Sequence, residues 1–242
     1  MARARSRAAR EPLSRERIEV TAFELIEREG GSGFSMRKLA AELGCEAMSI
    51  YHYYPSLAHL RDAMFDRYIA AIPRPSPAVP WLERMRQTLF AYREAALRRP
   101  GFFQYIVLHR SNTATGLAYL NEILTVFRDA GFDLEMTARL FRAVGYYITG
   151  AALDEAAGYA RGPSAVEPVP DEIAVRDYPL ITAINPYFKP SERQATFALG
   201  VEMLLDGIAR IHRQMARGKP PVQSPPVTPA APRARPSRNS NR

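Results

Sequence analysis

Apolar residues recur every three or four positions along most of the middle of this chain, and no stretch alternates apolar with polar residues over a strand's length. The helical spacing is repeatedly interrupted by helix-ending residues, at Gly30-Gly31, Gly44, Pro55, Pro100-Gly101 and Gly131. Segments that are apolar along one helical face build a core by packing helix against helix. We therefore predict an all-α protein of nine or ten helices.

Four helices are predicted ahead of a segment with four prolines in eight residues, Pro73–Pro80, which we interpret as a boundary between two functional regions. They run over Ser14–Gly30, Ser35–Gly44, Glu46–Tyr53 and Ser56–Ile72. The later helices are predicted over Trp81–Arg99, Phe102–Arg110, Thr113–Ala130, Asp133–Gly158, Glu172–Ile184 and Ser191–Arg217. The predicted domains are therefore residues 13–72, an N-terminal three-helix DNA-binding unit with its linking helix, and residues 81–217.

The two ends of the chain carry its excess positive charge. Residues 1–12 and 217–242 together hold 10 of the 33 basic residues and one of the 25 acidic ones, which leaves 23 basic against 24 acidic between them. We predict a flexible basic arm over residues 1–12. Residues 218–242 hold seven of the 20 prolines with little to bury, and we predict a disordered tail there. The net charge of +8 is therefore weak evidence for a basic folded surface.

Several classes of protein are disfavoured by what the sequence lacks. No apolar run approaches the roughly 18–20 residues that cross a bilayer. The single cysteine, Cys45, cannot form an internal disulfide, so we expect a cytoplasmic protein without membrane contact. There is no glycine-rich phosphate loop, no metal-spaced histidine or cysteine cluster and no serine elbow. We therefore expect no enzyme activity, no cofactor and no metal.

The strongest local pattern lies between Phe34 and Pro55, where two short helices are predicted to meet at Gly44. Ser35 is suited to cap the first of them, and Gly44 permits the positive φ of a tight turn. The small core of this helix-turn-helix is predicted to consist of Leu39, Ala40, Leu43, Cys45 and Ile50.

A second helix of this kind places its N-terminal residues in the major groove of DNA. The predicted DNA-binding residues are Ser35, Arg37, Ala47, Met48, Ser49, Tyr51, His52 and Tyr53. Hydroxyl groups reach phosphates, and methionine or alanine contacts a thymine methyl group. Any pair of antiparallel helices needs a glycine turn, but we expect the aromatic run Tyr51–Tyr54 to be exposed, and so many exposed aromatic residues favour DNA contact.

The motifs Leu39-Ala-x-Glu-Leu-Gly-Cys45 and Ser49-Ile-Tyr-x-Tyr-Tyr-Pro55 resemble the N-terminal domain of the tetracycline-repressor (TetR) family. The resemblance covers about residues 13–72 closely. It implies a homodimeric repressor that a small ligand releases from an inverted-repeat operator in double-stranded DNA. By position, it implies that Ser35 and Arg37 contact the DNA backbone or a base and that residues 48, 49 and 51–53 form the recognition surface.

The chain departs from this family at Leu57, where many members carry a lysine that meets a phosphate. His59 or the arginine-rich arm are the candidates to compensate. Residues 13–72 contain seven basic and nine acidic residues, so we expect local contacts and helix N-termini to set the affinity for DNA.

The second region is predicted to bind a ligand and to form the dimer. Apolar residues line one face of the helix Asp133–Gly158, which also carries small residues, and a wide apolar stripe follows the last helix from Phe197 to Met215. Two such helices per subunit suit an intersubunit four-helix bundle. Both stripes could instead be core within one chain, but we favour the interface for the last helix.

A pocket for an apolar or aromatic effector needs apolar walls and a few polar groups. The predicted ligand-binding residues are Phe102, Tyr105, His109, Asn112, Tyr146 and Tyr147. The alternative for the whole chain is a helical adaptor that binds a protein and not DNA. An operator-shift assay distinguishes the two, and the sequence does not identify the effector or the operator.

Overall fold

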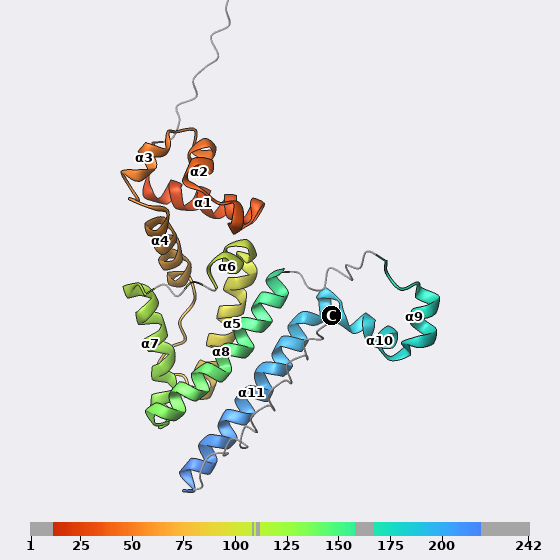
Figure 1. The fold of residues 1–242 in the computed structure, drawn as a ribbon. Helices are drawn as coiled ribbons and strands as arrows, with labels where there is room; N and C mark the ends of the chain where they lie inside the picture. The colour runs from red at the N-terminus through yellow and green to blue at the C-terminus, as the bar shows by residue number, and fades with distance from the viewer. Residues whose placement is uncertain (1–11, 108, 110–111, 158–166, 219–242) are drawn as a thin grey trace, which may run out of the picture.

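The computed structural model describes residues 12–107, 109, 112–157 and 167–218, and in these residues the chain is helical without a strand (Figure 1). The all-α prediction is confirmed. The predicted disordered tail, apart from Gly218, and the predicted arm, apart from Pro12, lie outside the described residues.

The N-terminal unit consists of α1 (Arg15–Glu29), a 3₁₀ turn (Gly31–Gly33), α2 (Met36–Leu43), α3 (Ala47–Tyr51) and α4 (Leu57–Ala70). Three serines cap these helices as their sequence positions predict. The side-chain oxygens of Ser14, Ser35 and Ser56 accept bonds from backbone amides three residues further on, at 3.2, 3.3 and 3.3 Å. The starts of α1, α2 and α4 are therefore set by local hydrogen bonding.

The turn between α2 and α3 has the conformation that its glycine predicts. Gly44 lies in the left-handed region with φ of +66°, and the amides of Gly44 and Cys45 bond to carbonyls of α2. Helix α3 is shorter than predicted and ends at Tyr51. The amides of Tyr53 and Tyr54 both bond to the carbonyl of Ile50, so the chain turns away before Pro55 is reached.

The remaining elements are α5 (Trp81–Arg98), α6 (Pro100–Ile106), α7 (Ala114–Asp129), α8 (Leu134–Ala157), α9 (Asp171–Asp177), α10 (Pro179–Ile184) and α11 (Arg193–Ala216), with 3₁₀ turns over Asn185–Phe188 and Pro190–Glu192. The prediction of one helix over 172–184 is wrong, because Pro179 divides it. Tyr178, which precedes that proline, is held out of the helical region at φ −130° and ψ 53°. Figure 1 shows α9 and α10 standing apart from the bundle formed by α5, α7, α8 and α11.

The hydrophobic core does not divide at Pro73–Pro80. One cluster of buried side chains joins residues of α1–α4, such as Ile18 and Met64, to Phe102 of α6 and Tyr119 of α7. A second cluster lies further along the bundle and joins the first half of α5 to α7, α8 and α11. The N-terminal unit and the remaining helices, α5 to α11, which we call the helical body, therefore share a core. Helix α1 packs on α6, and α4 packs on α7.

Two polar contacts reinforce this junction. The carboxylate of Glu27, on α1, accepts bonds from the amides of Gly101 and Phe102 at 2.8 and 3.0 Å and so caps α6 from outside. A Cβ atom at position 101 would lie 2.9 Å from the carbonyl oxygen of Ile26, so only glycine allows this approach. Thr113, at the start of α7, donates a bond of 2.5 Å to Asp66 of α4.

Candidate nucleic-acid interface and ligand site

Helix α3 presents apolar and aromatic side chains to solvent. Met48 is 64% exposed and Tyr51 39%, and among the described residues up to 72 these are the large hydrophobic side chains classed as exposed. His52 is exposed beside them, while Ala47 and Ser49 are half-buried. Ile50, on the opposite side of the helix, is fully buried and anchors α3 to the core. The exposed side of α3 therefore has the character of a contact surface.

The end of the aromatic run does not lie on that surface. Tyr54 is only 2% exposed and donates a hydrogen bond to Glu19, so the prediction that it is exposed is wrong. Tyr53 is half-buried, and its hydroxyl donates a bond of 2.7 Å to the carbonyl oxygen of Leu13. Because α3 ends at Tyr51, the chain folds Tyr54 back onto Glu19 of α1 and Tyr53 onto Leu13, which lies just before α1. Tyr53 is still partly exposed, but its hydroxyl is bonded within the chain.

Glu19 is the polar centre of this contact, with its side chain 11% exposed. One of its oxygens accepts the bond from Tyr54, and the other accepts a bond of 2.9 Å from Arg67 of α4, which also pairs with Glu16 at 2.7 Å. Burial, together with the bond to Glu19, raises the pKa of Tyr54 to about 12. The network joins α1, the end of α3 and α4. Sequence reasoning missed it, although a glutamate beside the buried Ile18 was a usable signal.

Two of the cations near the helix-turn-helix are ion-paired with neighbouring carboxylates. Arg28 pairs with Glu42 at 3.0 Å and with Glu29 at 3.2 Å, and Lys38 pairs with Glu29 at 3.1 Å. Arg37 is exposed and forms no ion pair with the described residues. It is therefore the cation at the start of α2 that is open to a phosphate or a base edge.

The structure does not bring the six predicted ligand-binding residues together. Phe102 is fully buried against Phe23, with ring centroids 4.7 Å apart, and Tyr105 packs on Phe34 at 6.2 Å. His109, 5.4 Å from the Tyr105 ring, is exposed, and so is Asn112. This group therefore lies at or near the junction of α6 with the N-terminal unit.

The other two predicted ligand residues lie on α8 and diverge. Tyr146 is 70% exposed, whereas Tyr147 stacks on Phe197 of α11 and donates a bond of 2.9 Å to its carbonyl oxygen. Adjacent helical residues point about 100° apart, and here one of the two side chains faces solvent while the other packs on α11. The sequence identified both residues as tyrosines on one helix, but it did not predict that their side chains point to different surroundings.

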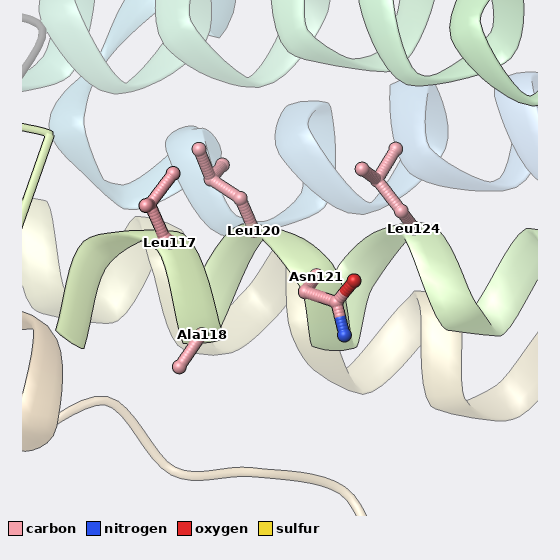
Figure 2. A pocket seen from close by; sticks show the side chains of 5 residues that line it. All are labelled: Leu117, Ala118, Leu120, Asn121 and Leu124. Carbon is pink, nitrogen blue, oxygen red and sulfur yellow. The ribbon is translucent and has the colours of Figure 1, made fainter. Parts of the chain in front are cut away.

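The surface of α7 carries a shallow apolar groove of about 560 Å³ that sequence reasoning did not identify. Figure 2 shows Leu117, Leu120 and Leu124 projecting from one side of α7, with Ala118 on the other side and Asn121 next to them. Spacings of three and four residues place these leucines on one helical face, and that spacing was visible in the sequence.

Comparison with known proteins extends over both parts of the chain. The family described as "Bacterial regulatory proteins, tetR family" matches residues 18–64, and "Tetracyclin repressor-like, C-terminal domain" matches residues 74–211. The chain belongs to the TetR family. The resemblance inferred from the motifs around Gly44 is confirmed and extends to the second half of the chain.

Two TetR-family repressors and one solved structure illustrate the similarity. The chain is 34% identical to the repressor DrrR1 of Streptomyces coeruleorubidus over 61% of its own length and 55% of that protein. It is 27% identical to the class A tetracycline repressor from transposon 1721 of Escherichia coli, over 78% of this chain and 87% of that protein. A possible TetR-family regulator from Streptomyces coelicolor A3(2) superposes with a TM-score of 0.67 at 25% identity, covering 82% of this chain and all of that one.

Leu57, the departure from the TetR motif, begins α4 and is half-buried against the core. His59, named from the sequence as a possible substitute for the missing lysine, interacts through its Nδ1 with the hydroxyl of Ser56 at 2.8 Å. The position therefore contributes apolar packing in this TetR-family chain, and the histidine ring is already engaged at the helix cap.

The stripe on α11 is largely core within the chain. Phe197, Val201, Leu205 and Ile208 are at most 4% exposed and pack against α5 and α8, so their interpretation as an interface is wrong. A different face of α11 exposes Leu199 at 63% and Met203 at 68%. The sequence showed one wide apolar stripe on this helix, but only the packing showed which of its residues are buried within the chain and which are exposed.

None of the described helices is long and apolar enough to cross a membrane. In the same residues, no three histidine, cysteine, aspartate or glutamate side chains are grouped as metal ligands.

Proposed function

We propose that this TetR-family chain is a ligand-responsive transcriptional repressor that binds an inverted-repeat operator as a homodimer and is released by a small molecule. The observation that supports it most directly is the exposure of Met48 and Tyr51 on a helix that is otherwise anchored by Ile50. We assign DNA binding to residues 13–72, and effector binding and dimerisation to residues 81–217.

In this proposal α3 enters the major groove. Tyr51 and Met48 contact base edges, with Ala47, Ser49, His52 and the ring of Tyr53 around them. Arg37 and the hydroxyl of Ser35 contact the phosphate backbone from the start of α2. Arg28, Lys38 and Arg67 of this unit are already ion-paired, so we propose that few phosphate contacts hold the protein on DNA and that the salt dependence of its DNA binding is shallow.

The dimer is proposed to form through the exposed faces of α8 and α11. Leu199, Met203 and Tyr146 are large side chains that are more than half exposed there, and they lie outside the intrachain core. An isologous contact of two α8–α11 pairs would cover them in a four-helix bundle. A two-fold dimer presents two recognition helices to two half-sites about one helical turn apart.

The effector is proposed to bind the helical body. One relative is named a tetracycline repressor, and we extend to this chain the general property of release by a small, largely apolar molecule. We also propose a cytoplasmic regulator without enzyme activity, because the relatives are named as regulators and the DNA target lies in that compartment.

The test is binding of the purified dimer to DNA upstream of its own gene and of the adjacent genes. Fluorescence anisotropy measures this binding with and without competitor DNA. We expect a protected inverted repeat in footprinting. Absence of specific binding across these regions would reject the repressor and favour the helical adaptor, on which Met48 and Tyr51 would meet a protein.

A further inference from the structure

The junction where α3 ends and α4 begins lacks the cation that the TetR motif leads one to expect. Leu57 occupies that position, and its side chain is half-buried against the core. The ring of His59 interacts with the hydroxyl of Ser56 at the start of the same helix. A phosphate contact at this edge of the protein would therefore have to come from another element.

Arg15, the first residue of α1, brings a guanidinium group to this junction. Its Cζ atom lies 4.9 Å from the centre of the Tyr54 ring, and Tyr54 is three residues ahead of Leu57, where α4 begins. The carbonyl oxygen of Leu13 accepts the bond of 2.7 Å from the hydroxyl of Tyr53. The start of α1 is therefore fixed beside the end of α3 through two successive tyrosines.

The charge of Arg15 stays unpaired, although two carboxylates lie within the next turn of α1. Glu16 and Glu19 both pair with Arg67 of α4, at 2.7 and 2.9 Å, and Glu19 also accepts the bond from Tyr54. Arg15 is exposed and forms no ion pair with the described residues. Because Arg67 satisfies both acids, the guanidinium of Arg15 remains available to an anion.

The contact with Tyr54 prepares this guanidinium for binding. A cation is attracted to the face of an aromatic ring, and a planar guanidinium stacks there better than an ammonium group does. Tyr54 is 2% exposed and bonded to Glu19, so the ring that supports Arg15 is held rigidly. A side chain that is already held in place loses less conformational entropy when it binds. Arg15 is therefore a preorganised cation beside the exposed side of α3.

We propose that Arg15 is a further DNA-binding residue of this chain, and that it contacts a backbone phosphate next to the end of α3, where the lysine at position 57 is missing. The assignment rests on the proposed function as a DNA-binding repressor. It differs from both candidates named from the sequence, because Arg15 belongs to α1 and not to the arm over residues 1–12. The donors of a guanidinium fit two phosphate oxygens at once, so the contact adds affinity but carries no sequence preference.

The test measures the affinity of the full-length protein for two duplexes of equal length over a series of salt concentrations. One duplex carries the footprinted inverted repeat, and the other has a random sequence. Arg15→Gln should weaken binding about tenfold at low salt, and the slope of log affinity against log salt should become shallower by about two, because a dimer loses two phosphate contacts. Both effects should be the same on the two duplexes.

Arg28→Gln is the matched control. It removes the same charge from another exposed arginine of α1, but this one is paired with Glu29 and Glu42, so the slope should not change. Arg15→Lys keeps the charge and loses the planar group, so the slope should stay while affinity falls about threefold. In the double variant Arg15→Gln/Leu57→Lys the slope should return to the wild-type value, because a cation is restored at the same edge.

An unchanged slope in Arg15→Gln, whatever its melting temperature, would overturn the proposal and leave Arg15 as a residue of the fold. A loss of affinity confined to the inverted repeat would indicate a base contact and would also overturn it. If footprinting finds no specific site, the proposed function as a repressor fails, while the slope of Arg15→Gln on the random duplex still decides whether the phosphate contact exists. No binding of the wild type to either duplex would overturn both.

Discussion

The N-terminal unit and the helical body expose their apolar side chains in different ways. In residues 12–72 the exposed large hydrophobics are Met48 and Tyr51, both on α3. In the described part of the body they are spread over α7, α8, α9, α10 and α11, with Leu120, Tyr146, Val175 and Met203 as examples. The N-terminal unit therefore exposes large hydrophobic side chains on one helix, whereas the helical body exposes them on several helix faces that are open to further contacts.

The two regions also differ in the way that charge is buried. In the N-terminal unit, Glu19 is held by a phenol and by Arg67, whose side chain is 41% exposed. In the body, Arg93 and Glu155 form an ion pair at 2.7 Å with side chains 5% and 8% exposed. Arg93 also bonds to Gln194 at 2.6 Å and lies 4.8 Å from the centre of the Phe197 ring, so it joins α5, α8 and α11.

The largest effect should come from breaking that buried pair. Replacing Glu155 with alanine leaves Arg93 buried without its carboxylate, and we expect a loss of about 3–5 kcal/mol in the free energy of unfolding. Urea denaturation of the variant measures it. The matched control is Glu135→Ala, whose pair with Arg139 is exposed and should contribute less than about 1 kcal/mol. Equal losses in both variants would contradict the difference in burial.

The next largest effect concerns α3. Tyr51→Ala should weaken operator binding about 100-fold in the dimer, since a base contact contributes roughly 1–3 kcal/mol and is made twice. Thermal unfolding and the dimer should stay unchanged, because Tyr51 is outside the core. Tyr187→Ala removes an exposed tyrosine of the body and should leave DNA affinity intact. Loss of the dimer in Tyr51→Ala would show that Tyr51 has a structural role. The exposed residues of α3 would then not differ in role from those of the helical body.

A third change tests whether the exposed face of α11 forms the dimer. Met203→Glu places a charge on a face that we propose to be covered, so the dimer should dissociate at micromolar concentration and operator affinity should fall at least tenfold. Sedimentation analysis reports the mass. Thr125→Glu, an exposed position on α7, is the control and should remain dimeric. A dimeric Met203→Glu would exclude this face from the interface.

The smallest effect is a gain. Leu57→Lys restores the lysine that many TetR-family members carry at the start of α4, and we expect operator affinity to rise up to about tenfold at low salt. The slope of log affinity against log salt should steepen by about two for a dimer, one phosphate per subunit. Leu57→Gln controls for the loss of apolar packing. An unchanged slope in Leu57→Lys would mean that position 57 does not face the DNA backbone.

The sequence determined the elements of this protein whose causes are local. Ser14, Ser35 and Ser56 cap helices through amides three residues away, and Gly44 makes the turn because it alone of its neighbours adopts a positive φ. Tyr178-Pro179 could have predicted the break between α9 and α10 on the same grounds. Family membership was also visible, because the motif residues lie close together along the chain.

The tertiary structure decided which face each side chain joins. Tyr54 belongs to an aromatic run in the sequence, yet it is buried because α3 ends two residues earlier than predicted and Glu19 accepts the hydrogen bond of its hydroxyl. Tyr146 and Tyr147 are neighbours that face solvent and α11 respectively. Tyr68 and Tyr119 share one buried cluster only because α4 packs on α7. Each outcome depends on helices that are distant in sequence, and periodicity carries no information about which of them will meet.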